Sequence, residues 1–169
     1  MYWLKYGCNL CCQYGCQKGY CLKIKNIEQQ DNEAFIYILE VFNEKVEKEF
    51  NEKKIGYLKN YFKKTLMHPV SRTNFNERKF FLDALDSMTI IEIEILGFLF
   101  NKNDKIQLKE ISLPYDIYVI VGGVERLKSY GFLESITVAF QIGNGIDNRL
   151  IEKLNLSEFA IKFYKFCIE

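Results

Sequence analysis

The sequence after Met88 switches between two hydrophobic periodicities, and this limits the folds that are open to it. Thr89-Ile90-Ile91-Glu92 fits a capping box, in which the threonine and glutamate side chains satisfy free backbone N–H groups at a helix start. Apolar residues then recur every three or four positions, as in the buried stripe of a helix: Ile91, Ile95, Leu96, Leu99 and Phe100. Polar residues 101–104 end this stripe, and residues 106–111 are predicted to form a short second helix.

A third helix is predicted over residues 115–130. Pro114 stands where its first turn begins, and Gly131 follows as a C-terminal cap. The interior contains Gly122 and Gly123, each of which costs about 1 kcal/mol relative to alanine in a helix. The β-branched residues before them favour strand, so a short strand followed by a helix from Gly123 is the alternative. We favour the continuous helix.

Strict alternation replaces the helical period after Gly131. The run Ile136-Thr137-Val138-Ala139-Phe140 lies within residues 132–142, Gly143-Asn144-Gly145 supplies turn residues, and residues 149–156 complete a hairpin. Ser157 is suited to cap a closing helix. Helix, short helix, helix, hairpin and helix is the order of a helix-turn-helix motif followed by a β-wing. We therefore predict a winged-helix domain over residues 88–169.

Residues 27–87 have helical periodicity. Apolar side chains predict one long amphipathic helix over residues 27–56: Phe35, Ile38, Leu39, Phe42, Val46 and Phe50. A second helix is predicted over residues 57–67 and ends at His68-Pro69, because the residue before proline avoids the α region. A third is predicted over residues 77–87. The expected fold class is mainly α (α+β), with a helical bundle in residues 27–87, and the first helix offers a homodimer surface through residues 27–53.

Residues 1–26 form a separate cysteine-rich segment. Cys8, Cys11, Cys16 and Cys21 follow the spacing C-x2-C-x4-C-x4-C, and four thiolates at such intervals can enclose a tetrahedral zinc ion. This spacing resembles the zinc knuckle of retroviral nucleocapsid proteins, which binds single-stranded RNA, although Cys16 stands where that family has histidine. Cys12 is an atypical fifth cysteine. Two alternatives therefore stay open: an exposed tail without metal, or a disulfide or redox role.

The sequence shows no catalytic constellation. His68 is its single histidine, and it stands before a proline at a predicted helix end. Neighbouring acids such as Glu92 and Glu94 are better explained by solvated helix faces than by acid–base catalysis. We therefore expect a protein that is not an enzyme. The N-terminus also lacks the apolar run of a signal peptide or spanning helix, which predicts a cytoplasmic protein without a membrane partner.

The charge of the chain gives no support to a nucleic-acid partner. The 23 basic and 22 acidic residues leave a net charge of +1. A winged helix reads base edges with the start of its third helix, and the side chains there are poorly suited to base readout in this sequence; they are Leu113, Pro114, Tyr115, Asp116 and Tyr118. Tyr115 and Tyr118, together with Arg126 and Lys128, are the candidate residues for binding a partner, either a protein or duplex DNA.

Parts of the sequence resemble the bacterial abortive-infection alpha family over roughly residues 57–169. The matching stretches are Asn60-Tyr61-Phe62-Lys63-Lys64 through His68-Pro69, Lys79-Phe80-Phe81-Leu82-Asp83-Ala84-Leu85, Ile93-Glu94-Ile95-Leu96, Val124-Glu125-Arg126-Leu127-Lys128, and Leu156-Ser157-Glu158-Phe159-Ala160. In that family a phenylalanine-rich helix and a capped helix lead into a winged-helix end. The resemblance implies a prophage- or defence-associated bacterial protein without established catalytic residues. The cysteine-rich segment has no counterpart there.

These observations predict a non-enzymatic winged-helix protein that acts by macromolecular binding, in phage defence or regulation. The first alternative is a DNA-binding transcriptional regulator, whose two wings would meet two half-sites in a dimer built through residues 27–53. The second alternative is an RNA-binding protein that uses a four-cysteine zinc knuckle at Cys8, Cys11, Cys16 and Cys21.

Overall fold

The structure is a computed structural model, and it describes residues 29–102, 104–136 and 147–169. Within these ranges the chain is mainly helical and contains one small antiparallel sheet of three strands. The expectation of a mainly α protein with some β structure is therefore confirmed. The cysteine-rich segment at residues 1–26 and the turn predicted at Gly143-Asn144-Gly145 lie outside the described residues.

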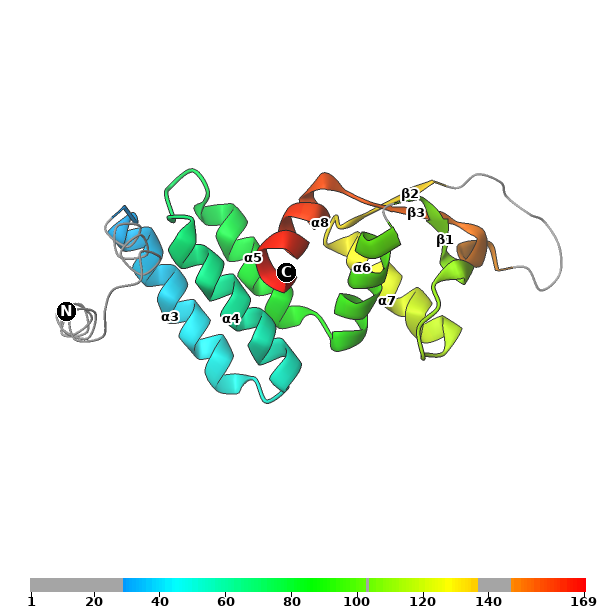
Figure 1. Cartoon of the computed structure of the whole chain (residues 1–169), viewed down its shortest axis with the longest axis horizontal. Coiled ribbons are helices and arrows are strands. Elements are labelled where there is room, and N and C mark those ends of the chain that lie inside the picture. The colour runs from blue at the N-terminus through cyan, green and yellow to red at the C-terminus, as the bar shows by residue number, and fades with distance from the viewer. Residues whose placement is uncertain (1–28, 103, 137–146) are drawn as a thin grey trace, which may run out of the picture.

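The first three helices of the described residues form a bundle at one end of the molecule (Figure 1). They are α3 (Asn32–Lys48), α4 (Glu52–Met67) and α5 (Phe75–Ser87). Each of the predicted ends at Met67 and Ser87 is confirmed. Lys45 of α3 reaches Asp83 and Asp86 of α5, with its Nζ atom 3.1 and 2.8 Å from their carboxylate oxygens. This pairing ties α3 to α5 beside the apolar core.

The prediction of one continuous helix over residues 27–56 is wrong, because a short loop separates α3 from α4. Asn51 caps α4: its side-chain oxygen accepts hydrogen bonds from the backbone N–H groups of Lys53 and Lys54 at 3.0 and 3.3 Å. The Glu49 carboxylate accepts two further bonds from loop backbone N–H groups. These local bonds replace the helical ones, so the chain reverses and α4 packs beside α3.

The second half of the described chain combines helices with the sheet. Its elements are α6 (Ile90–Lys102), β1 (Ile106–Gln107), the 3-10 helix η1 (Leu108–Glu110), α7 (Ile117–Ser129), β2 (Leu133–Ile136), the 3-10 helix η2 (Asn148–Ile151), β3 (Lys153–Leu156), α8 (Glu158–Phe163) and the π-helical turn η3 (Tyr164–Ile168). The strand order is β1-β3-β2, with both pairs antiparallel. Leu133 lies opposite Leu156, and Ile106 lies opposite Leu154.

Local signals in this half agree with the structure. The Thr89–Glu92 capping box is present, with the Thr89 N–H donating to the Glu92 carboxylate at 3.0 Å. Gly131 adopts a φ of 71°, the left-handed conformation expected of a helix C-terminal cap. The Ser157 hydroxyl accepts a hydrogen bond from the Ala160 N–H at 3.1 Å and caps α8. The antiparallel pairing of β2 with β3 confirms the predicted strand pairing over residues 133–136 and 153–156. Residues 149–151, predicted as strand, belong instead to the 3-10 helix η2, and residues 137–142 of the predicted first strand lie outside the described residues.

Two expectations for this half need correction. Residues 106–111 do not form one short helix, because Ile106 and Gln107 pair with β3 and only Leu108–Glu110 turns helically. Long-range pairing with a strand about 45 residues later cannot be read from so short a segment. The alternative of a strand before Gly123 is also wrong, since α7 is helical from Ile117. Its buried face on α6 outweighs the cost of two glycines.

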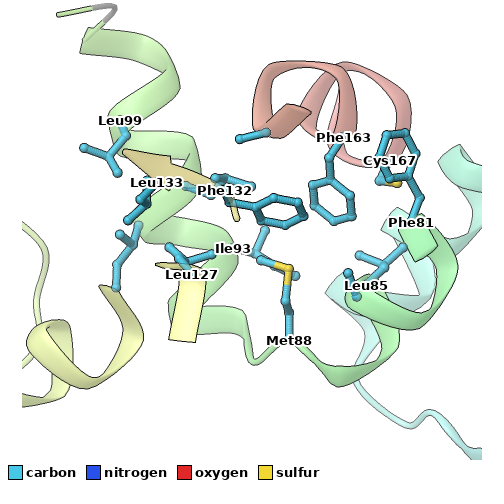
Figure 2. Close-up of a cluster of buried hydrophobic side chains, with 14 of the residues drawn as sticks. Phe81, Leu85, Met88, Ile93, Leu99, Leu127, Phe132, Leu133, Phe163 and Cys167 are labelled. Atoms are coloured by element: carbon cyan, nitrogen blue, oxygen red, sulfur yellow. The ribbon is translucent and has the colours of Figure 1, made fainter. Parts of the chain in front are cut away.

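One cluster of buried side chains joins the bundle to the second half (Figure 2). The ring of Phe163 in α8 lies between the rings of Phe81 and Phe132. Its centroid is 5.5 Å from that of Phe81 and 4.6 Å from that of Phe132. Met88, at the predicted boundary between the two regions, is itself 1% exposed. The two halves therefore share an apolar core.

The η3 turn closes against α4. The Asn60 side-chain amide donates to the Ile168 carbonyl at 3.0 Å. The Phe166 ring lies edge-on to Tyr61, at 5.6 Å between centroids, and under the Arg78 guanidinium at 3.9 Å. Residues from near the C-terminal end of the chain thus complete the core of the N-terminal bundle.

Candidate partner-binding face

Helix α7 has one buried face and one exposed face. Ile120, Val121, Gly123, Val124 and Leu127 are buried against the rest of the molecule. The exposed residues recur with helical spacing and share the opposite face: Tyr118, Val119, Gly122, Glu125, Arg126 and Ser129. Tyr118 and Val119 are 59% and 44% exposed, so two apolar side chains face solvent one turn before Gly122.

The two adjacent glycines of α7 have different surroundings. A Cβ atom on Gly123 would come 2.7 Å from the Cδ1 atom of the fully buried Ile95, so the absence of a side chain lets α7 approach α6 closely. A Cβ atom on Gly122 would meet nothing within 4 Å. Gly122 therefore leaves a smooth patch of helix backbone beside Tyr118 and Val119.

The candidate tyrosines have separate environments. The Tyr115 hydroxyl donates to the Glu94 carboxylate at 2.6 Å and ties the segment before α7 to α6. This bond, assisted by Lys53 at 3.1 Å, lowers the pKa of the Glu94 carboxyl. Tyr118 follows the Asp116 cap, which accepts a hydrogen bond from the Tyr118 backbone N–H at 2.8 Å. Tyr115 thus has a role in folding, whereas the Tyr118 ring projects from the exposed face.

The basic candidates are held by acidic partners. The Nε atom of Arg126 lies 3.1 Å from a carboxylate oxygen of Glu92, a residue that is 2% exposed. Lys128 lies 2.6 Å from Glu152 and 2.9 Å from Glu125. Burial alone would lower the pKa of Lys128, but the hydrogen bonds to these two carboxylates outweigh it and leave the pKa raised. Both cations are therefore already neutralised within the protein.

The face has no surplus of positive charge. Glu125 is exposed on it, Asp116 is exposed at the N-terminal cap of α7, and Arg149 of η2 is paired with Asp147 at 2.7 Å. Phosphate binding depends on Lys or Arg side chains that release counterions, and among the described residues of this face each such cation has a carboxylate partner. The surface is therefore better suited to an uncharged partner than to a nucleic-acid backbone.

Periodicity alone did not identify Val119 and Gly122 as part of this face. The run Ile117–Val121 is apolar on every side of the helix, so the pattern cannot distinguish the buried residues from the exposed ones. The capping aspartate at residue 116 fixes where the helix begins. From that start, the close contact of Gly123 with Ile95 sets which side faces the core.

Other candidate groups lie elsewhere. His68 is exposed at the C-terminal cap of α4, as expected for a helix-terminal histidine. Burial raises the pKa of the Cys167 thiol well above its usual value, which favours its protonated form. In the described ranges no three His, Cys, Asp or Glu side chains form a group that could hold a metal ion. The four cysteines of the predicted zinc site lie outside those ranges.

Comparison with protein-family models, curated proteins and solved structures found no match to this chain. The resemblance to the abortive-infection alpha family therefore stays a prediction. Among the described helices, none has both the length and the apolar character needed to cross a lipid bilayer.

Proposed function

We propose that residues 88–169 form a winged-helix domain that acts by binding another macromolecule. The order α6, β1, η1, α7, β2, η2, β3 supports this assignment, because a winged helix has a helix, a strand, two helices and a β-hairpin in that sequence, and η2 lies within the connection between the two hairpin strands. The three-stranded antiparallel order β1-β3-β2 also fits. In this assignment α7 is the second helix of the helix-turn-helix motif and presents its exposed face to the partner.

We propose that the partner is a second, different protein. We also propose that the chain acts by binding and is not an enzyme. One observation carries this choice: the exposed face of α7 presents Tyr118 and Val119 beside the bare backbone at Gly122, while Arg126 and Lys128 are in ion pairs. Tyrosine is one of the residue types most enriched among the hot spots of protein interfaces. The resemblance described above adds a proposed role in phage defence or regulation.

We expect Tyr118→Ala to weaken partner binding by about 2 kcal/mol, or roughly thirtyfold in Kd, because a central tyrosine is a typical interface hot spot. The partner is first captured by the wild-type chain, identified by mass spectrometry and purified. The affinity of the purified partner is then measured by calorimetry for the wild-type chain, for Tyr118→Ala and for a control variant. Tyr37→Ala is the matched control, since Tyr37 is 43% exposed on α3, far along the chain from α7. Equal binding by wild type and Tyr118→Ala would contradict the proposal.

The alternative of a DNA-binding regulator is tested with the same protein preparation. Mixed-sequence duplex DNA is titrated at low and at moderate salt and followed by fluorescence anisotropy. We expect no saturable binding at either salt concentration, because the cations of α7 are neutralised. Tight binding that weakens steeply with salt would replace the protein-binding proposal with the regulator.

A further inference from the structure

An apolar groove runs between α3 and α4 on the bundle, away from α7. Its volume is about 390 Å³, and it is lined by Phe42, Val46, Ile55, Lys59, Phe62, Lys63, Leu66 and Met67. The stacked rings of Phe42 and Phe62, 4.7 Å apart, form its floor. No α5 residue lines the groove, so this part of the apolar surface of α3 and α4 faces away from α5.

The two sides of the groove carry opposite charges. On α4, Lys59 and Lys63 are exposed and one helical turn apart. On α3, the exposed Glu40 and Glu47 lie two turns apart and form a row with Asn43, beside the α3 residues of the groove. In the part of the chain that the structure describes, none of the four charged residues is in an ion pair with another side chain. Each row is therefore available to a partner of opposite charge.

We propose that the groove binds a second copy of this chain, which forms a symmetric dimer with a four-helix interface. A two-fold axis parallel to the helices places α3 of one protomer on α4 of its partner, so the acidic row meets the basic row twice. An axis across the helices would place α3 on α3 and α4 on α4, with like charges in contact. The charge pattern thus selects one arrangement, independently of the partner proposed for α7.

The register within each protomer indicates which charges meet. Phe42 stacks on Phe62, and α3 and α4 are antiparallel neighbours, as Figure 1 shows. Because the helices are antiparallel, a step toward the N-terminus of α3 corresponds to a step toward the C-terminus of α4. Glu40, two residues before Phe42, is therefore roughly level with Lys63, which follows Phe62. Since the proposed axis preserves height along the helices, Glu40 of one protomer lies level with Lys63 of the other. This pair is expected twice in the dimer.

The loop between α3 and α4 gives a second observation in favour of the proposed dimer. Phe50 in this loop is 93% exposed, the highest exposure among the large apolar residues of the described chain. The same axis places the loops of both protomers at one end of the four helices. Phe50 of each protomer then lies beside the loop of the other, where it is shielded from water.

The proposal is tested by charge reversal followed by equilibrium sedimentation, from low micromolar to several hundred micromolar protein. Glu40→Lys and Lys63→Glu each place like charges across the interface, and each is expected to raise the dimer Kd by about tenfold or more. The double variant restores opposite charges, and its Kd is expected to return to within about threefold of wild type. Glu134→Lys, an exposed change on β2, is the control for net charge and is expected to leave the Kd unchanged.

Phe50→Ser gives an independent readout, because an exposed loop residue contributes little to folding of one protomer. Its Kd is expected to rise by about tenfold while circular dichroism stays unchanged. A wild-type chain that sediments as a monomer at every concentration overturns the proposal. A dimer whose Kd is unchanged by both charge reversals overturns it too. If each single variant raises the Kd but the double variant does not restore it, the α3-on-α4 arrangement is ruled out.

Discussion

Replacing Phe163 with alanine is expected to lower the free energy of unfolding by about 3–5 kcal/mol, the usual cost of removing a buried phenylalanine ring. Phe163 is fully buried and lies between Phe81 of the bundle and Phe132 at the start of the hairpin (Figure 2). The cavity would therefore open inside the core that joins the two halves. Folded domains commonly have a free energy of unfolding of only about 5–15 kcal/mol, so the substitution removes a large share of it.

The measurement is urea unfolding together with amide hydrogen exchange in α4 and α7. We expect the Phe163→Ala variant to lose protection in both helices, because its ring contacts both halves. Ile36→Ala is the control, since Ile36 is 54% exposed, and it is expected to change stability by about 0.5 kcal/mol or less. Loss of protection in one helix alone would show that the halves are stabilised independently.

The adjacent glycines of α7 are expected to respond to alanine with opposite signs. Gly122→Ala adds a methyl group to open space and should raise the free energy of unfolding by about 0.5–1 kcal/mol through helix propensity. Gly123→Ala gains the same propensity but forces its Cβ atom against Ile95, which is packed in the core. Overpacking costs about 1–3 kcal/mol. We therefore expect a net loss of up to about 2.5 kcal/mol for Gly123→Ala.

Thermal and urea unfolding of the two variants, measured in parallel, provides the comparison. Each variant controls for the other, because the substitution, the helix and the neighbouring sequence are the same. Two equally stabilised proteins would mean that Ile95 moves aside at no cost. Two equally destabilised proteins would contradict the open environment of Gly122 and with it the smooth patch on the candidate face.

The sequence was most informative where structure depends on neighbouring residues. The capping box at Thr89 and Glu92, the left-handed Gly131 and the Ser157 cap each involve hydrogen bonds or dihedral angles within a few residues. A helix end that is set by a following proline or by polar residues also depends only on nearby residues. The helix ends at Met67 and Ser87 were accordingly predicted correctly. Such signals determine where elements start and stop before any tertiary contact is known.

Two features were missed for different reasons, one because a local signal was overlooked and one because it depends on a tertiary contact. Phe50 continues the apolar spacing of α3 yet is almost fully exposed, because the Asn51 cap starts a new helix at that point. The capping asparagine was the available signal, and the hydrophobic pattern concealed it. By contrast, β1 is defined only by its pairing with β3.

The candidate site was predictable in part. Tyr118 was chosen from sequence and is exposed, but its companions Val119 and Gly122 emerge only once the buried side of α7 is known. Arg126 and Lys128 are paired with Glu92 and Glu152, which lie 34 and 24 positions away in the chain. Glu125, three positions before Lys128, is a local partner, but the pairing with Glu92 and Glu152 cannot be read from neighbouring residues.

The closure of η3 on α4 has a consequence for synthesis on the ribosome. Residues 32–87 can form three helices early, but the rings of Phe163 and Phe166 that fill their core follow about 80 residues later. At about 5–20 residues per second, the delay is roughly 4–16 s. Throughout that interval the nascent bundle exposes apolar surface around Tyr61 and Phe81 that the finished protein covers completely. Slower elongation lengthens this exposure and gives neighbouring chains more time to bind there.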